Sequence, residues 1–281
     1  MSGAVIERVT RNARRLARGG VLAATLAGAI AVPARAGAPT TLAYQVYFGG
    51  LKTLALDAAI ETAGDRYRVR LEAHTEGFID WLIGWTARAT SDGAILDDAV
   101  RPARHVNRSV VRGSRRDVTL TFRADGAIDA TVEPSAEADA REPVTPAQMH
   151  GALDPISAVL AATRTLGVRH SCAQRLPVFD GRRRFDLAFS DGGGTVLAPS
   201  AYGSFSGKAT LCLFRYIPVA GFQASRRGDG RDRVYRVWLA PVVDGLPPLP
   251  VRIEADTAFG LVIVHLVGSG GTPQEAAGSG D

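Results

Sequence analysis

The sequence contains two cysteines, Cys172 and Cys212, and their chemistry depends on the compartment in which the protein resides. In a cytosolic protein such a pair suggests metal or redox chemistry, whereas in an exported protein it forms a structural disulfide. The spacing is far from Cys-x-x-Cys, which disfavours a thioredoxin-like redox role. His170 precedes Cys172 by two residues, but no other histidine and cysteine stand at zinc-binding spacing. If the protein is exported, we therefore expect the two cysteines to form a disulfide. We predict no metal site.

A search for catalytic motifs finds no recognisable set. The five histidines form neither His-x-x-x-His nor His-Glu-x-x-His, and no serine occupies Gly-x-Ser-x-Gly. The cluster from Gly192 to Gly194 lacks the Lys-Ser/Thr of a phosphate-binding loop, and we interpret it as a turn. We assign no catalytic residue and no cofactor. A hydrolase with an unrecognised carboxylate pair is an alternative, and its nearest candidates are Asp180 and Asp186.

Three consecutive arginines, Arg182, Arg183 and Arg184, are candidates for contact with an anionic ligand. Guanidinium groups can bind phosphate or carboxylate in a bidentate manner. Similar clusters lie within residues 112–116 and 226–233. The competing interpretation is that these arginines lie at strand ends and turns, beside acids such as Asp180. The rule that charge runs usually form solvated faces favours that structural interpretation.

The most apolar segment of the first half runs from Phe78 to Trp85. We expect a loop that leads into a strand, in which Trp81 and Trp85 point to the same side. That side is either the protein core, which is favoured, or the wall of a ligand cavity. In a partly closed sheet, a concave wall formed by Phe78, Trp81 and Trp85 could bind an acyl chain or a peptide.

The N-terminus has the pattern of a secretory signal peptide. Five arginines from Arg8 to Arg18 precede an uncharged run from Gly19 to Val32, and Ala34-Arg35-Ala36 supplies a small-residue cleavage site. The run is shorter than the ~20 residues of a membrane-spanning helix, and no later segment approaches that length. We predict cleavage after Ala36, a periplasmic location and no transmembrane segment in the mature chain. The pair Arg14-Arg15 leaves twin-arginine export as an alternative to the ordinary secretory route.

The charge balance argues against nucleic acid as a partner. Residues 1–36 hold six of the 33 basic residues and one of the 28 acidic residues. The mature chain is therefore formally neutral, and its apparent basicity belongs to the targeting segment.

Period-two alternation of apolar residues predicts strands through most of the mature chain. Gly49-Gly50 separates the first two, and Asp125-Gly126 gives the strongest hairpin signal. Asp154-Pro155 supplies an N-cap and a first helical position, and Gly167 is the expected stop of that helix. A shorter helical turn is expected at residues 146–150, after a surface linker.

These elements predict a mainly β protein with one strongly curved antiparallel sheet, either an open barrel or a β-spiral, and one or two helices packed against it. We assign residues 1–36 to the signal peptide, 37–267 to a single β-rich domain with a helical segment near 146–167, and 268–281 to a disordered tail. Two β-domains flanking the helical middle are the alternative.

Three short stretches resemble a bacterial envelope family known only as a domain of unknown function, number three-one-zero-eight. They are Asp154 to Ala158, Val178 to Arg183, and Cys212 to Tyr216 with Val219 to Phe222. The resemblance spans Leu42 to Val267 and implies an exported β-rich domain without assigned catalytic residues. In shape the expected fold is similar to periplasmic half-barrel lipoprotein carriers and β-spiral envelope-integrity proteins, an architectural analogy that does not itself assign a function.

The sequence thus predicts a periplasmic, non-enzymatic binding or scaffold protein of the cell envelope, with a lipid, acyl chain or peptide held in the concave sheet. Two alternatives stand beside it: the hydrolase described above and a purely structural partner of another envelope protein.

Overall fold

The structure is a computed structural model that describes residues 39–96, 99–134, 143–222, 233–257 and 260–270. The predicted signal peptide, residues 271–281 of the predicted tail and most of the arginine cluster at 226–233 lie outside these residues.

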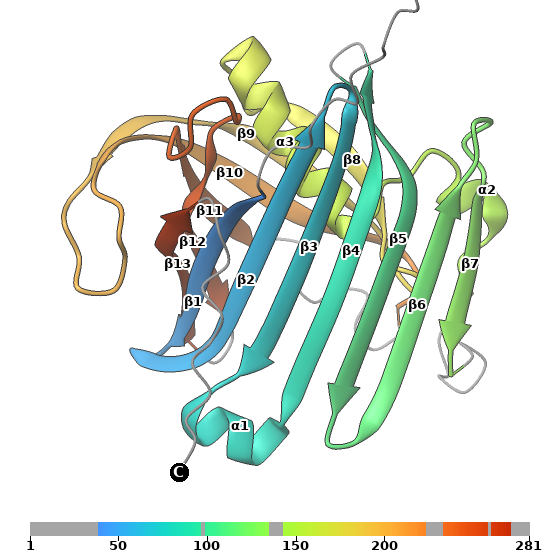
Figure 1. Cartoon of the computed structure of the whole chain (residues 1–281), viewed down its shortest axis with the longest axis horizontal. Coiled ribbons are helices and arrows are strands. Elements are labelled where there is room, and N and C mark those ends of the chain that lie inside the picture. The colour runs from blue at the N-terminus through green and yellow to red at the C-terminus, as the bar shows by residue number, and fades with distance from the viewer. Residues whose placement is uncertain (1–38, 97–98, 135–142, 223–232, 258–259, 271–281) are drawn as a thin grey trace, which may run out of the picture. The chain divides into compact units, whose positions relative to one another are not determined.

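The described residues form thirteen strands and three helices (Figure 1). The first seven strands are β1 (Thr40–Phe48), β2 (Leu51–Ala63), β3 (Arg66–Thr75), β4 (Trp85–Leu96), β5 (Ala99–Val111), β6 (Ser114–Phe122) and β7 (Ile128–Glu133). Helix α1 (Gly77–Ile83) lies between β3 and β4, and helices α2 (Pro146–Met149) and α3 (Pro155–Arg169) follow β7. The last six strands are β8 (Gln174–Phe179), β9 (Arg184–Leu197), β10 (Gly207–Ala220), β11 (Val234–Ala240), β12 (Leu249–Thr257) and β13 (Gly260–Gly270).

All thirteen described strands belong to one antiparallel sheet, in the order β7-β6-β5-β4-β3-β2-β1-β13-β12-β11-β10-β9-β8. Strands pair with their neighbours in sequence, and the pairing of β1 with β13 joins the two halves. The edges, β7 and β8, therefore come from the middle of the chain, and the sheet is not closed into a barrel. This confirms the predicted fold class. The two-domain alternative predicted two sheets, and the structure has one.

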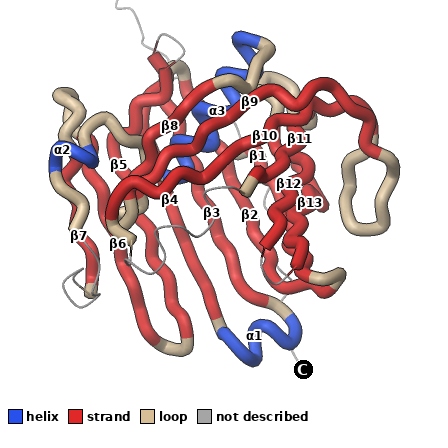
Figure 2. The backbone as a smooth tube through the Cα atoms, turned by 180° about the vertical axis from the view of Figure 1, so that it is seen from behind, coloured by secondary structure: helices blue, strands red, loops and turns tan. Residues whose placement is uncertain are grey.

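Helix α3 lies inside the curved sheet, between β4 and β5 on one side and β8 on the other (Figures 1 and 2). Its start is fixed by Asp154, whose carboxylate accepts hydrogen bonds from the backbone N–H groups of Ile156 and Ser157, both at 3.0 Å. Ile156 packs with the β3 and β5 core, and Ala158 packs with Val178 on β8. Helix α3 thus packs against strands from both halves of the sheet.

The two edges of the sheet approach each other at one end. Leu153 pairs with β8, donating to the carbonyl of Pro177 and accepting from the N–H of Phe179, each at 2.8 Å. On the turn after β8, a Cβ on Gly181 would lie 2.4 Å from a methyl carbon of Val118 on β6. These contacts cover hydrogen-bonding groups and apolar surface that an open edge would expose to other chains.

Residues 77–83 form a helix, so the prediction of a loop leading into a strand that holds both tryptophans is wrong. Gly77 at φ +59° and Gly84 at φ +54° bound the helix, and the N–H of Gly84 donates to the carbonyl of Asp80 at 2.7 Å. Trp81 lies on α1, and Trp85 begins β4. The favoured core position of Trp81 is also wrong, because this side chain is 80% exposed.

Two glycine assignments and one strand end are also corrected. Gly192 lies within β9, where a Cβ would come 2.6 Å from Cγ of Leu211, so close packing and not a turn requires glycine there. Helix α3 continues through Gly167, whose absent side chain leaves room for Pro248. Strand β13 extends to Gly270, three residues into the predicted tail, because it pairs with the start of β1.

Candidate functional site

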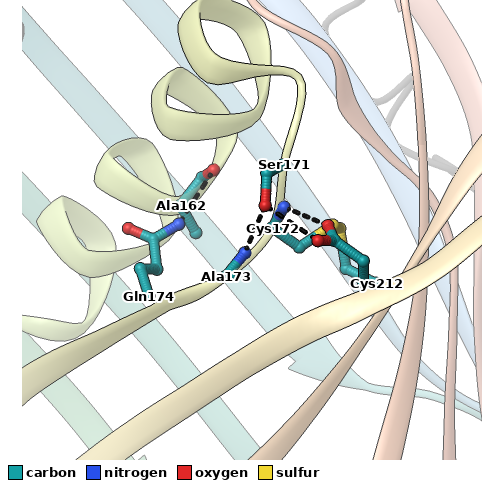
Figure 3. The surroundings of a disulfide bond; sticks show 7 residues. Ala162, Ser171, Cys172, Ala173, Gln174 and Cys212 are labelled. Atoms are coloured by element: carbon teal, nitrogen blue, oxygen red, sulfur yellow. Dashed lines mark hydrogen bonds between the residues drawn. A yellow bond between two sulfur atoms is a disulfide. The ribbon is translucent and has the colours of Figure 1, made fainter.

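Cys172 and Cys212 are joined by a disulfide with their Cα atoms 5.8 Å apart, as predicted (Figure 3). Cys172 follows the end of α3, and Cys212 lies in β10. The N–H of Cys172 donates to Asp191 at 2.6 Å, and the hydroxyl of Ser171 donates to the same carboxylate at 2.8 Å. Both cysteines are buried in a cluster that includes Leu166 of α3. The bond therefore clasps the end of the helix to the sheet.

The three candidate anion-contacting arginines bind groups of the protein itself. Arg182, which is buried, donates to the carbonyl of Pro134 at 2.9 Å, just beyond the end of β7. Arg183 donates to the carboxylate of Asp180 at 2.8 Å. Arg184 donates to Asp186 at 2.5 Å. This arrangement matches the structural interpretation of the cluster.

The two carboxylates of the hydrolase alternative likewise have arginine partners. Asp180 accepts from the backbone N–H groups of Arg182 and Arg183 at 3.0 and 2.7 Å, which shapes the turn between β8 and β9. Asp186 also accepts from Arg175 at 2.7 Å. These contacts give each carboxylate a structural partner.

The aromatic residues predicted to line a ligand cavity, Phe78, Trp81 and Trp85, do not line the main hollows of the described residues. Phe78 and Trp81 stack on each other on α1, with ring centroids 5.6 Å apart, and are 68% and 80% exposed. An inner hollow of about 290 Å³ lies elsewhere, against Tyr67, Leu160 and Leu246.

Five buried polar side chains, each at most 3% exposed, link α3 to the inner face of the sheet. Ser91 donates to Asp154 Oδ1 at 2.6 Å, and Nδ1 of His105 lies 2.7 Å from the Ser91 hydroxyl. On the other side, Ser157 donates to Asp154 Oδ2 at 2.5 Å and lies 2.7 Å from the hydroxyl of Tyr67. Because the single proton of Ser91 goes to Asp154, Nδ1 of His105 must be a donor.

This serine, histidine and aspartate set does not have the geometry of a catalytic triad. In a triad the two ring nitrogens face the serine and the aspartate separately. Here Nδ1 of His105 faces both, at 2.7 Å from Ser91 and 3.3 Å from Asp154. Burial alone raises the pKa of Asp154, but the hydrogen bond and charge of His105, with the bonds from Ser157 and Ser91, lower that pKa below its ordinary value. The network therefore has a structural role: it holds the start of α3 against the sheet.

The outer face of the sheet, away from α3, carries a concentration of arginine. Side chains alternate between the two faces of a strand, and the register aligns the outward positions of β3, β4, β5 and β6 in rows. Eight exposed arginines occupy these positions: Arg66, Arg68, Arg70, Arg88, Arg101, Arg104, Arg108 and Arg115. The acids at such positions on the same four strands are Glu72, Asp92 and Asp117. We call this surface the arginine face.

Three of the eight arginines are ion-paired. Arg70 contacts Glu61 of β2 at 2.6 Å, Arg88 contacts Glu72 at 3.3 Å, and Arg115 contacts Asp117 at 2.6 Å. The other five make no ion pair with any acid of the described residues. Their guanidinium donors are therefore available to solvent or to a ligand.

Three adjoining hollows lie along the arginine face. A groove of about 750 Å³ is lined by Arg70, Arg88, Arg108 and Arg115. A second hollow, of about 310 Å³, shares Arg70 and Arg108 with it and adds Arg68 and Arg104. A third, of about 430 Å³, continues from Arg68 to Arg66 and Arg101, and three acids, Glu61, Asp65 and Asp92, line it as well. In the sequence, the alternation of Arg68 and Arg70 with apolar residues indicates that one face of this strand is exposed to solvent. The alignment of that face with β4 and β5 depends on strand register and could not be predicted.

Within the described part of the chain, no group of three or more histidine, cysteine, aspartate or glutamate residues could hold a metal ion. Among the same residues, no helix combines the length and apolar character needed to cross a bilayer.

Comparisons with known proteins identify a family. The family model described as "Protein of unknown function (DUF3108)" matches residues 43–267. No curated protein matches the sequence. One similar solved structure is a beta-barrel-like protein of domain of unknown function DUF1849 from Brucella abortus, at 12% identity and a TM-score of 0.47, with 83% of this chain and 97% of that chain covered. Another is a hypothetical protein from Chlamydia trachomatis, at 9% identity and a TM-score of 0.30, with 86% and 90% covered.

Proposed function

The chain belongs to the DUF3108 family of proteins of unknown function, and from this premise we propose that it is a periplasmic, non-enzymatic binding and scaffold protein of the cell envelope. Its binding surface is the arginine face, and its ligand is an extended polyanion that carries carboxylate or phosphate groups. The observation that carries this proposal is the set of five arginines without ion pairs along three adjoining hollows.

The packing of α3 supports a binding surface on the outside of the sheet. The helix occupies the concave side, where the sequence had suggested a lipid or peptide, and the buried network around Asp154 holds it there. The inner hollow of about 290 Å³ is at the lower limit for a ligand pocket. The outer groove of about 750 Å³ falls within the usual range.

The chemistry of the arginine face favours an anionic ligand. Guanidinium groups remain charged at every physiological pH and present paired N–H donors that match carboxylate and phosphate oxygens. Five cations without ion pairs on one sheet face also raise the local concentration of anions and speed their association. A sheet held from within by a helix and a disulfide supplies a backbone that fixes the spacing of these arginines.

Export to the periplasm rests on the N-terminal sequence and the cysteine pair. The arginine-rich start, the uncharged run and the small residues at Ala34 and Ala36 form a secretory signal. A buried disulfide is stable in an oxidising compartment.

We expect the variant Arg68→Gln/Arg104→Gln/Arg108→Gln to bind polyanions about tenfold more weakly, because each lost contact of an exposed cation is worth ~0.5 kcal/mol. Labelled poly-glutamate and labelled inorganic polyphosphate serve as separate probes, titrated by fluorescence anisotropy at low and high salt. The probe with the larger loss identifies carboxylate or phosphate as the preferred group.

The matched control removes three exposed cations elsewhere, in the variant Arg169→Gln/Lys208→Gln/Arg215→Gln. It should bind both probes within about twofold of the wild type. Equal losses in the two variants would show that net charge alone attracts the probes, and an absence of binding by the wild type at low salt would refute the proposal.

A further inference from the structure

Exposed apolar side chains are concentrated at the end of the sheet that carries α1 (Figure 1). Leu51 begins β2, Val111 ends β5, and the N–H of the next residue, Arg112, donates to the carbonyl of Gly84 at 3.3 Å. The exposed members are Leu51 at 69%, Phe78 at 68%, Trp81 at 80%, Leu82 at 42%, Ile83 at 40% and Val111 at 41%. We call this set the apolar tip.

Packing within the protein does not explain the composition of α1. No residue of this helix is buried, although five of its seven residues are large and apolar, and four of these five are exposed. The helix is held at its base through backbone contacts: the N–H of Glu76 donates to the carbonyl of Thr53 at 3.0 Å, and Gly84 closes the other end. Figure 1 shows α1 beyond the ends of β3 and β4, with its outer side turned away from the sheet.

Two acids and one arginine lie around the apolar tip, and each acid has a partner within the protein. Glu76 pairs with Lys52 at 3.0 Å, and Asp80 accepts from the hydroxyl of Thr75 at 2.7 Å. Arg112 donates from Nε to the carbonyl of Leu82 at 2.9 Å, which fixes its guanidinium group beside α1. Arg112 makes no ion pair with any described acid, so its charge is not neutralised.

We propose that the apolar tip inserts into the interfacial region of an anionic lipid bilayer. Tryptophan and phenylalanine favour the boundary between headgroups and acyl chains, and a short helix rich in apolar residues can enter that layer without spanning it. Arg112, fixed beside the helix, would then lie at the level of the lipid phosphates, which complement its charge. This membrane contact is independent of polyanion binding by the arginine face.

The test is co-sedimentation of the exported protein with vesicles of phosphatidylethanolamine and phosphatidylglycerol, and with vesicles of phosphatidylcholine alone. The protein is purified from the periplasm, and mass spectrometry defines its N-terminus, so that every variant has the same one. We expect the variant Phe78→Ser/Trp81→Ser to lose at least about tenfold in vesicle partitioning. Arg112→Gln should lose severalfold on the anionic vesicles alone.

The control Val196→Ser/Tyr202→Ser removes two exposed apolar residues that are not part of the apolar tip, at 70% and 51% exposure. It should partition like the wild type, and circular dichroism should show that all variants are folded. Three results would overturn the proposal: wild type that does not bind anionic vesicles, tip and control variants that lose partitioning equally, or sedimentation velocity showing that the tip residues hold two copies of the chain together.

Discussion

At the scale of single residues, the structure assigns most of the polar side chains noted in the sequence to roles within the fold. Arg182, Asp180 and Asp186 hold the turn and strand edges around β8 and β9. The polar groups that the sequence did not single out, Ser91 and His105, form the buried network with Asp154. Only the N-cap role of Asp154 could be predicted, because it depends on the local pattern Asp-Pro. The partners on β4 and β5 depend on tertiary packing.

The buried carboxylate of Asp154 should make stability depend on pH. Its pKa is lowered in the folded protein, so its contribution is present above the unfolded pKa of ~3.9 and is lost as the pH falls through the folded value. We expect Asp154→Asn to lower the free energy of unfolding by about 3 kcal/mol at neutral pH, because buried charge-assisted hydrogen bonds are lost. The difference in free energy of unfolding between wild type and variant should become smaller below about pH 4.

Urea unfolding followed by circular dichroism across this pH range measures the gap. Asp125→Asn is the control, since Asp125 makes an equivalent bond to the N–H of Ala127 at 3.0 Å but is exposed. Its effect should be below about 1 kcal/mol at every pH. A gap for Asp154→Asn that stays constant down to the acid limit of folding would contradict the assignment of an ionised buried carboxylate.

At the scale of elements, local signals predicted the hairpins and the start of α3, and they failed where glycine serves tertiary packing. Asp125-Gly126 does form the turn between β6 and β7, with Gly126 at φ +87°. The sequence pattern predicts breaks at Gly167 and Gly192, but both lie inside an element: a Cβ on Gly192 would lie 2.6 Å from Leu211, and one on Gly167 would lie 3.3 Å from Pro248. Helix α1 was missed because a run of large apolar residues predicts burial, and on this helix they are exposed.

The disulfide joins two elements, and its loss should be measurable as the loss of a link between α3 and β10. The two cysteines are 40 residues apart, and closing such a loop stabilises the folded state by roughly 3 to 4 kcal/mol in the chain-entropy model. We expect Cys172→Ser/Cys212→Ser to lower Tm by roughly 10 °C in calorimetry under oxidising conditions.

Treatment with a reductant is the internal control for this double variant. Dithiothreitol should lower the Tm of the wild-type protein toward that of the variant, because it reduces the disulfide. It should leave the Tm of the variant unchanged. Equal Tm values for oxidised wild type and variant would show that the link carries no stability.

At the scale of the whole described sheet, the connectivity places the first and last described strands, β1 and β13, at its centre and strands from the middle of the chain at its edges. The alternation of strands in the sequence predicted a curved antiparallel sheet, and the structure confirms it. The pairing of β1 with β13 could not be predicted, because it joins segments more than 200 residues apart and neither carries a local signal for the other. The same pairing extends β13 beyond its predicted end. The arginine face, by contrast, depends on the register of β3, β4, β5 and β6 with one another.

This topology predicts the pattern of amide hydrogen exchange. Strands β1 and β13 each have a partner on both sides, and they join the two halves, so their exchange requires separation of the sheet. Strand β7 has one partner, β6, and most of its residues are exposed. We expect amides in the middle of β1 and β13 to exchange at least about a hundredfold more slowly than those of β7, as measured by mass spectrometry of peptic fragments.

Strand β8 serves as the comparison edge: it pairs with β9 and is also bridged by Leu153, so its exchange should be intermediate. Protection of β7 equal to that of β1 would mean that the edge opens only with the whole sheet, and that the β1 and β13 pair is not its most stable part.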